Sequence, residues 1–263
     1  MQKNENIDHG KEFDWGNTSK DYAAYRDIYP DDFYQRIVDL GLCTKGQKAL
    51  DLGTGTGVLP RNFYKFGASW TGTDISKNQI TEAVRLADEA NMNIHYFAVP
   101  AEDTGLAEHT FDVITACQCF MYFDIPKVMA EVLRLLKPDG SFLILYMAWL
   151  PFESEIAKKS EDLVLKYNPT WTGGHYKRFE PKVPTWSASY FEHVNCFAYD
   201  VDLKFTRESW HGRMIACRGI GASSLPGQEI ECFKKEHWDY MNTVPEVFEI
   251  PHYVSVFKFK GKQ

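Results

Sequence analysis

Residues 49–57 read ALDLGTGTG, an apolar run that ends in three alternating glycines, Gly53, Gly55 and Gly57. Glycine has no Cβ, so a backbone with this spacing can approach a ligand closely. Several kinds of nucleotide-like ligand are held by a glycine turn between a strand and a helix. The residues around the glycine turn must therefore indicate which of these ligands it binds.

The flanking sequence alternates between strand-like and helix-like runs. Predicted strands cover 48–53, 69–75, 93–99, 111–117 and 141–149. Predicted helices cover 58–66, 77–90 and 125–136, with Ser76 as an N-cap and a turn at 137–140. Such alternation predicts right-handed crossovers and a parallel sheet with helices on both faces.

Outside this core the rhythm changes. Pro30 divides the aromatic-rich segment 19–40 into two helices, and the polar residues 1–20 are expected to fray. After Trp149 a helix over 153–167 and an irregular, aromatic-rich piece are expected, then a strand over 193–205, a helix capped by Thr206, a helix over 227–242 and a last strand over 251–260. We expect one domain, 1–263, made of a helical cap (1–40), a cofactor-binding core (41–149), a substrate-covering insertion (150–191) and a C-terminal part (192–263).

Composition excludes several classes of protein. The chain has 263 residues and a net charge of −7, which disfavours a nucleic-acid partner. It shows no apolar run long enough for a membrane span and no signal peptide. Its six scattered cysteines suit a reducing cytoplasm, and we expect a cytoplasmic monomer or homodimer.

Two features separate the candidate ligands of the glycine turn. A dinucleotide site has the pattern Gly-x-Gly-x-x-Gly, but Val58 stands where the third glycine belongs, although Asp74 would suit a ribose. Asp51 places a carboxylate near any pyrophosphate, and no Gly-Lys-Ser/Thr follows, which excludes a P-loop. A zwitterionic amino-acid tail with a positively charged sulfur fits this environment better.

Five short motifs in register resemble class I S-adenosylmethionine-dependent methyltransferases, in particular the methyltransferase-11 and UbiE-like group. They are DLGTGTG (51–57), TDIS (73–76), AED (101–103), FDVI (111–114) and LKPDG (136–140). The resemblance covers about 48–145. It implies a Rossmann-like three-layer α/β sandwich whose seven-stranded, mostly parallel sheet has the order 3-2-1-4-5-7-6 with strand 7 antiparallel. An N-terminal helical cap and an insertion after strand 5 would complete the fold.

The resemblance also implies the cofactor, S-adenosylmethionine, with S-adenosylhomocysteine as product, and the residues that hold it. Asp74 would bind the ribose hydroxyls and Ile75 would pack on the adenine. The remaining expected cofactor residues are Tyr25, Arg26, Asp51, Gly53, Thr54, Gly55, Gly57, Ser76, Ala101, Glu102 and Cys117. Pro100 stands where many relatives have Asp, so Glu102 is the candidate to replace that adenine contact.

The acceptor of the methyl group is expected to be a small molecule. The sequence Ala116–Phe120 lacks the Asn-Pro-Pro-Tyr motif of enzymes that methylate the amino groups of nucleic acids or of glutamine. Candidate pocket residues are Tyr122, Trp149, Trp171, Tyr176 and Trp210, although any single Trp is expected to belong to the core. His175 and His211 are the only candidate catalytic groups, Arg213 and Arg218 are expected to be solvated, and no metal site is expected.

The sequence therefore favours a methyltransferase that acts mainly by positioning its small-molecule acceptor for in-line transfer. Two alternatives remain open. One is an NAD(P)-dependent oxidoreductase, and the other is a non-catalytic module that keeps the cofactor site but has no acceptor pocket.

Overall fold

A computed structural model describes residues 2–261, which form two compact units. The sheet unit contains residues 29–147, 180–199 and 254–261, and the helical unit contains residues 2–28, 148–179 and 200–253. Three of the five boundaries between the units fall within the three longest strands, and the other two fall after residues 28 and 179. The expected core, 41–149, falls almost entirely in the sheet unit, whereas the expected insertion, 150–191, is divided between the two units.

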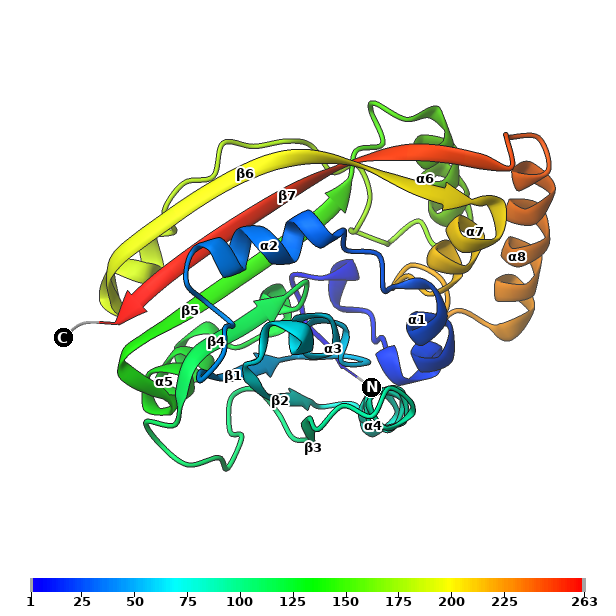
Figure 1. Cartoon of the computed structure of the whole chain (residues 1–263). Helices are drawn as coiled ribbons and strands as arrows, with labels where there is room; N and C mark the ends of the chain where they lie inside the picture. Colours follow the sequence, from blue (N-terminus) through cyan, green and yellow to red (C-terminus); the bar gives the residue numbers. More distant parts are fainter. Residues whose placement is uncertain (1, 262–263) are drawn as a thin grey trace. The chain divides into compact units, whose positions relative to one another are not determined.

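Seven strands form one sheet in the order β3-β2-β1-β4-β5-β7-β6, as the sequence predicted. The strands are β1 (Lys48–Leu52), β2 (Ser69–Asp74), β3 (His95–Ala98), β4 (Phe111–Cys117), β5 (Leu136–Trp149), β6 (Phe191–Thr206) and β7 (Val247–Gly261). Strands β3, β2, β1, β4 and β5 pair in parallel, and β7 runs antiparallel to them (Figure 1).

Eight helices flank these strands in the part of the chain that the structure describes. They are α1 (Ser19–Tyr25), α2 (Asp31–Asp39), α3 (Val58–Phe63), α4 (Lys77–Glu89), α5 (Ile125–Leu135), α6 (Glu155–Tyr167), α7 (Arg207–Ile215) and α8 (Gly227–Met241). Within residues 2–261, no helix has the length and apolar character needed to cross a membrane.

The predicted helix starts are confirmed by their caps. The Ser76 side chain accepts a hydrogen bond from the Gln79 amide at the start of α4. At α7, Thr206 accepts from the Ser209 amide, while the Ser209 hydroxyl accepts from the Thr206 amide. Each cap satisfies backbone donors that the first helical turn leaves without an intrahelical partner, which fixes where the helix begins.

The interior of the sheet unit is built on the central strands. Four of the five β1 residues are buried, as expected for a parallel strand covered on both faces. Phe142 of β5 stacks on Phe191 of β6 and on Phe259 of β7, with ring centroids 6.2 and 5.8 Å apart. These rings join the three strands at one end of the sheet into a single apolar core.

The predicted turn over 137–140 is wrong. Residues 136–140 already belong to β5, and Leu136 pairs with Phe111 before the register shifts between Phe111 and Val113. The Lys137 ammonium also pairs with the Asp112 carboxylate at 2.8 Å. Pairing with β4 therefore overrides the local turn preference of Pro-Asp-Gly.

The expected fraying of the N-terminal residues is also wrong for the part that the structure describes. Phe13 is buried and forms an antiparallel bridge with Ser223. The Asp14 amide donates to the Ala222 carbonyl at 2.8 Å. The polar composition of this segment does not indicate that it is ordered. Its few apolar and charged side chains have partners more than 150 residues away in the sequence.

Candidate functional site

The glycine turn lies at the carboxyl end of β1, where the neighbouring strands β2 and β4 lie on opposite sides of β1. Crevices at such a switch point are where open α/β sheets bind ligands. Gly53, Gly55 and Gly57 all have positive φ, of 61°, 56° and 75°, which only glycine adopts without strain. The Thr54 amide donates to the Thr73 carbonyl at 2.8 Å and ties the turn to β2.

Asp74 fastens the turn from the end of β2. One carboxylate oxygen accepts from the Gly55 amide at 2.9 Å, and the other accepts from the Ser76 amide at 2.8 Å. Burial raises the pKa of Asp74, and these two amide hydrogen bonds oppose the increase. The carboxylate thus joins the glycine loop to the start of α4, in the position that the sequence assigned to a ribose-binding acid.

Asp51 is buried beneath the turn rather than presented on it. Its side chain accepts from the Thr115 hydroxyl at 2.6 Å. Burial raises the pKa of Asp51 to about 7, although hydrogen bonds from Thr115 and Thr54 favour the carboxylate. Because burial favours the neutral form, repulsion of a pyrophosphate is weaker than a solvated carboxylate would give.

Two side chains that the sequence did not single out explain two of the three glycines. A Cβ on Gly53 would lie 2.8 Å from the Cys119 sulfur, and a Cβ on Gly57 would meet the Tyr96 hydroxyl. Tyr96 also packs against Gly72 of β2, where a Cβ would lie 2.7 Å from its ring. These glycines are therefore required by packing under the loop as well as by any ligand above it. No local motif marks Tyr96 or Cys119.

The residues expected around the adenine lie in the same unit. Ile75 is 56% exposed, which leaves an apolar side chain uncovered next to Asp74. Ala101 is buried, and the Glu102 carboxylate accepts from the Asp124 amide at 3.0 Å. Glu102 thus already supports the first turn of α5, whether or not it also reaches an adenine.

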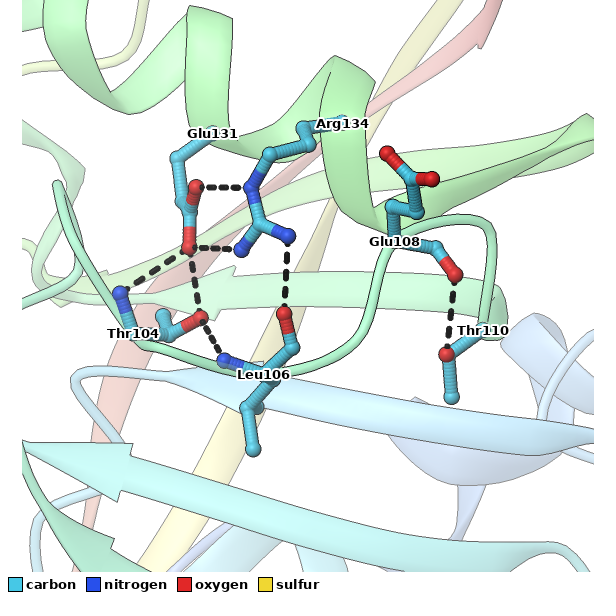
Figure 2. A network of polar contacts seen from close by, with 6 residues as sticks. All are labelled: Thr104, Leu106, Glu108, Thr110, Glu131 and Arg134. Carbon is cyan, nitrogen blue, oxygen red and sulfur yellow. Dashed lines mark hydrogen bonds and ion pairs between the residues drawn. The ribbon is translucent and has the colours of Figure 1, made fainter.

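A polar network holds the loop that follows Glu102 (Figure 2). Glu131 on α5 accepts from the Thr104 amide at 2.9 Å and from its hydroxyl at 2.6 Å. Arg134 pairs with Glu131 and donates to the Leu106 carbonyl at 2.8 Å. Burial alone would raise the pKa of Glu131, but the bonds from Arg134 and Thr104 outweigh it and lower the pKa. The loop geometry is therefore fixed before any ligand arrives.

Cys117 ends β4 beside the glycine turn, and its thiol donates to the Tyr29 hydroxyl at 3.3 Å. The next residue, Gln118, has a positive φ of 62°. Cys119 then points elsewhere and donates to the Leu52 carbonyl at 3.1 Å. The two thiols do not share a ligand set, and in the described residues no group of three or more His, Cys, Asp or Glu side chains could hold a metal ion.

Tyr25 and Arg26 lie in the helical unit. The Tyr25 ring packs on Gly212 of α7, where a Cβ would lie 2.2 Å from the ring, and its hydroxyl donates to Glu208. The Arg26 guanidinium lies over the Tyr22 ring, 4.8 Å from its centroid. Within this unit both residues thus have structural contacts, and their proposed role at the cofactor stays a prediction.

Three of the tryptophans expected in a pocket lie in the interior of the helical unit. Trp149, Trp171 and Trp210 are 9%, 6% and 0% exposed. Trp149 donates to the Glu161 carboxylate and packs edge-on against Trp210. Trp171 is enclosed by Gly173 and Gly219, where any Cβ would clash with its ring. Tyr176 and Tyr122 are only partly buried, so they are the members of the set with accessible surface.

His211 belongs to a buried chain of hydrogen bonds that joins α6, α7 and α8. The Ser160 hydroxyl donates to the Ile156 carbonyl at 2.8 Å, so it can only accept from Trp210 and from His237 Nε2. His237 Nδ1 must then accept from His211 Nδ1, 2.8 Å away. Burial lowers the pKa of His211 to about 4 and that of His237 to about 3, so both rings stay neutral near pH 7.

His175, the other candidate base, is exposed, and its backbone amide donates to Glu161 at 2.7 Å. The expectation that Arg213 and Arg218 are solvated is wrong. Arg213 is 2% exposed, with its guanidinium over the Trp149 ring, and Arg218 forms a buried ion pair with Asp8. Both arginines stabilise the interior of the helical unit.

Comparison with known proteins agrees with this geometry. Residues 50–144, which contain the glycine turn, Asp74 and β4, match the family described as methyltransferase domain (methyltransferase-11). The ubiquinone biosynthesis O-methyltransferase of Pseudoalteromonas translucida is 28% identical over 69% of this chain and 80% of its own length. The uncharacterized methyltransferase YcgJ of Bacillus subtilis is 31% identical over 48% of this chain.

Solved structures extend the similarity of fold beyond the matched segment. The structure of YcgJ superposes with a TM-score of 0.54 at 19% identity, covering 89% of this chain and all of YcgJ. An N-methyltransferase of Haemonchus contortus, solved with phosphomonomethylethanolamine and S-adenosylhomocysteine, gives a TM-score of 0.51 at 17% identity, covering 88% of this chain and 53% of the other. Such low identity supports the fold alone.

The sequence matches to several curated relatives, YcgJ among them, span only about half of the relatives' length, at 47%, 52% and 51%. On these grounds residues 50–144 of the chain match the methyltransferase-11 domain, and the chain is similar to S-adenosylmethionine-dependent methyltransferases.

Proposed function

We propose that this protein transfers the methyl group of S-adenosylmethionine to a small molecule. The observation that supports this most directly is the double hydrogen bond of Asp74, which holds the Gly55 and Ser76 amides at the end of β2. A fixed carboxylate beside a glycine turn is suited to two neighbouring ribose hydroxyls. The net charge of −7 agrees with a small acceptor better than with a nucleic acid.

In this proposal the glycine loop, through Gly53, Thr54 and Gly55, lines the methionine part of the cofactor. The buried Asp51 carboxylate favours the positive charge of the cofactor from beneath the loop, Ile75 packs on the adenine, and Ala101 with Glu102 forms the adenine edge. The other residues that we propose to hold the cofactor are the Cys117 backbone, Gly57, Ser76, Tyr25 and Arg26. The loop amides and Asp74 do not have to move to make these contacts, because Thr54, Gly55 and Ser76 are already held in place.

The chemistry that we propose is an in-line displacement at the methyl carbon. The acceptor's lone pair forms the new bond while the carbon–sulfur bond breaks and its electron pair stays on sulfur. A sulfonium is a good leaving group, so the protein contributes mainly by holding the two reacting atoms in line. A general base is needed only if the acceptor stays protonated at working pH. The low pKa of His211 argues against that residue as the base.

Isothermal titration with S-adenosylhomocysteine and with NAD tests the cofactor assignment. We expect micromolar affinity for S-adenosylhomocysteine and none for NAD. Gly55→Val should abolish binding, because valine strains a residue with φ of 56° and distorts the loop. Gly227→Val is the matched control, since nothing lies within 4 Å of its Cβ position. Binding of NAD instead would overturn the proposal in favour of an oxidoreductase.

A screen of small-molecule acceptors with methyl-labelled S-adenosylmethionine then tests turnover. Label should pass to at least one acceptor and not in the Gly55→Val variant. If the protein binds S-adenosylhomocysteine tightly but labels nothing, the non-catalytic module becomes the better description.

A further inference from the structure

A pocket of about 260 Å³ opens in the helical unit at the start of the expected insertion. It is lined by Leu150, Phe152, Glu153, Tyr176, Lys177 and Arg178. We propose that this pocket binds a small planar aromatic carboxylate. The proposal goes beyond the methyl-transfer function, because binding here requires neither the cofactor nor turnover.

The apolar part of the pocket points to a flat ligand. Phe152, which lines the pocket, is 54% exposed, and Phe179, which packs against the lining residue Tyr176, is 44% exposed. Tyr176 packs against Phe179 and Tyr253, with ring centroids 6.3 and 6.4 Å apart. Exposed aromatic surface gathered at a hollow is typical of a binding site. A cavity of about 150 Å³ accepts benzene, so this one suits one or two fused rings.

The charges point to an anion. The Arg178 guanidinium is already neutralised, because it pairs with the Glu153 carboxylate and with Asp200 at 2.9 Å. Lys177 differs: its ammonium lies 4.9 Å from the centroid of the Phe152 ring, and no carboxylate of residues 2–261 lies within ion-pair distance of it. Lys177 is therefore a pocket cation with no carboxylate paired to it directly, and it lies beside the exposed Phe152 ring, where it can pair with a carboxylate on a bound aromatic ring.

The segment that carries these side chains is held in place at several points. The His175 amide donates to the buried Glu161 carboxylate at 2.7 Å. At the other end, the Phe179 carbonyl accepts from the Tyr253 hydroxyl. Arg178 is fixed between its two carboxylates. A ligand thus meets a wall that is already ordered, which lowers the entropic cost of binding.

Calorimetric titration with 2-naphthoate and with its uncharged analogue 2-naphthalenemethanol tests the proposal on the full chain. We expect both to bind with 1:1 stoichiometry. Lys177→Met should weaken 2-naphthoate about fivefold, the upper range for an exposed ion pair, and leave the alcohol unchanged. Phe152→Ala should weaken both about tenfold through lost ring contact.

Lys235→Met is the matched control, because Lys235 is an exposed lysine of the same unit outside the pocket. It should leave both affinities unchanged. Phe152→Leu, which keeps an apolar side chain, replaces Phe152→Ala if circular dichroism shows that the alanine variant is unfolded. The proposal is overturned if the wild-type protein shows no saturable 2-naphthoate binding, or if Lys177→Met and Lys235→Met have the same effect.

Discussion

The hydrogen bonds of Asp74 in the sheet unit and the buried pairs of the helical unit link residues at different distances along the chain. Around the glycine turn, the hydrogen bonds of Asp74 and Ser76 join backbone amides to side chains less than 20 residues away. In the helical unit, Asp8 pairs with Arg218 and with Thr172, and Ser160 meets Trp210 and His237, all of them distant in sequence. The first kind of contact recurs with a motif, whereas the second exists only once the chain has folded.

This difference separates function from stability. Changes at the glycine turn should affect the binding of the cofactor, and changes at the buried pairs of the helical unit should affect the free energy of unfolding. Five experiments follow from this comparison.

The largest effect is expected from Asp8→Ala, which leaves the Arg218 guanidinium buried without its ion-pair partner. The free energy of unfolding, measured by urea denaturation, should fall by about 3–5 kcal/mol. The affinity for S-adenosylhomocysteine should be retained. Asp202→Ala removes an exposed carboxylate from the same unit and should change neither quantity. A large loss of cofactor affinity in Asp8→Ala would contradict the claim that changes in the helical unit affect stability and not cofactor binding.

Asp74→Ala should show the opposite pattern. It removes the acceptor for the Gly55 and Ser76 amides together with the proposed ribose contact. Calorimetry should show S-adenosylhomocysteine affinity reduced about 100-fold, as expected for the loss of two hydrogen bonds to a charged group. Asp88→Ala, at an exposed position of α4, should bind like the wild type. Full affinity in the Asp74 variant would mean that the site has been assigned to the wrong residues.

Cofactor affinity should also depend on pH through Asp51. Its pKa is raised from 3.8 to about 7 by burial, and the ionised form favours a cofactor ammonium. Affinity for S-adenosylhomocysteine should therefore rise about tenfold from pH 6 to pH 8, as the ionised fraction increases. In Asp51→Asn this dependence should vanish. A wild-type affinity that stays flat over this range would show that Asp51 does not favour the positive charge of the cofactor.

The raised pKa of Asp51 also predicts how the free energy of unfolding changes with pH. The folded-state pKa of Asp51 lies above the unfolded value, so its contribution to stability is present below about pH 4 and is lost as pH rises to about 7. Urea denaturation of the wild type and of Asp51→Asn over this range separates this contribution from those of other groups.

The smallest effect is expected from Tyr96→Phe. The Tyr96 hydroxyl is buried without a hydrogen-bond partner, while its ring fills the space beside Gly57 and Gly72. Removing the hydroxyl should change the free energy of unfolding by less than about 0.5 kcal/mol. Tyr96→Ala, by contrast, should cost about 3 kcal/mol, because it leaves a cavity under the loop. If both variants are equally destabilised, the hydroxyl has a role that packing does not explain.

The parallel sheet and the glycine turn could be predicted because alternating apolar runs and positive-φ glycines are local properties, whereas the strand order came from the resemblance of the motifs to a known family. The turn over 137–140 failed because pairing with β4 overrode it. Among the predicted site residues, the positions around Asp74 lie together in the sheet unit. The tryptophans, chosen for their size, are mostly interior. Aromatic type alone does not tell a pocket wall from a core, since both gain by removing the ring from water.

The sequence by itself determined the alternation of strands and helices and the residues at the carboxyl ends of β1 and β2, because these depend on short-range backbone geometry. Its motifs indicated the strand order only through their resemblance to a known family. Only the tertiary structure decided that Asp51 is buried under the turn, that Tyr96 and Cys119 lie beneath its glycines, and that Asp8 pairs with Arg218. Those contacts join segments far apart in the chain. Their energies come from burial and from the pairing of charges, which cannot be inferred from a short stretch of sequence.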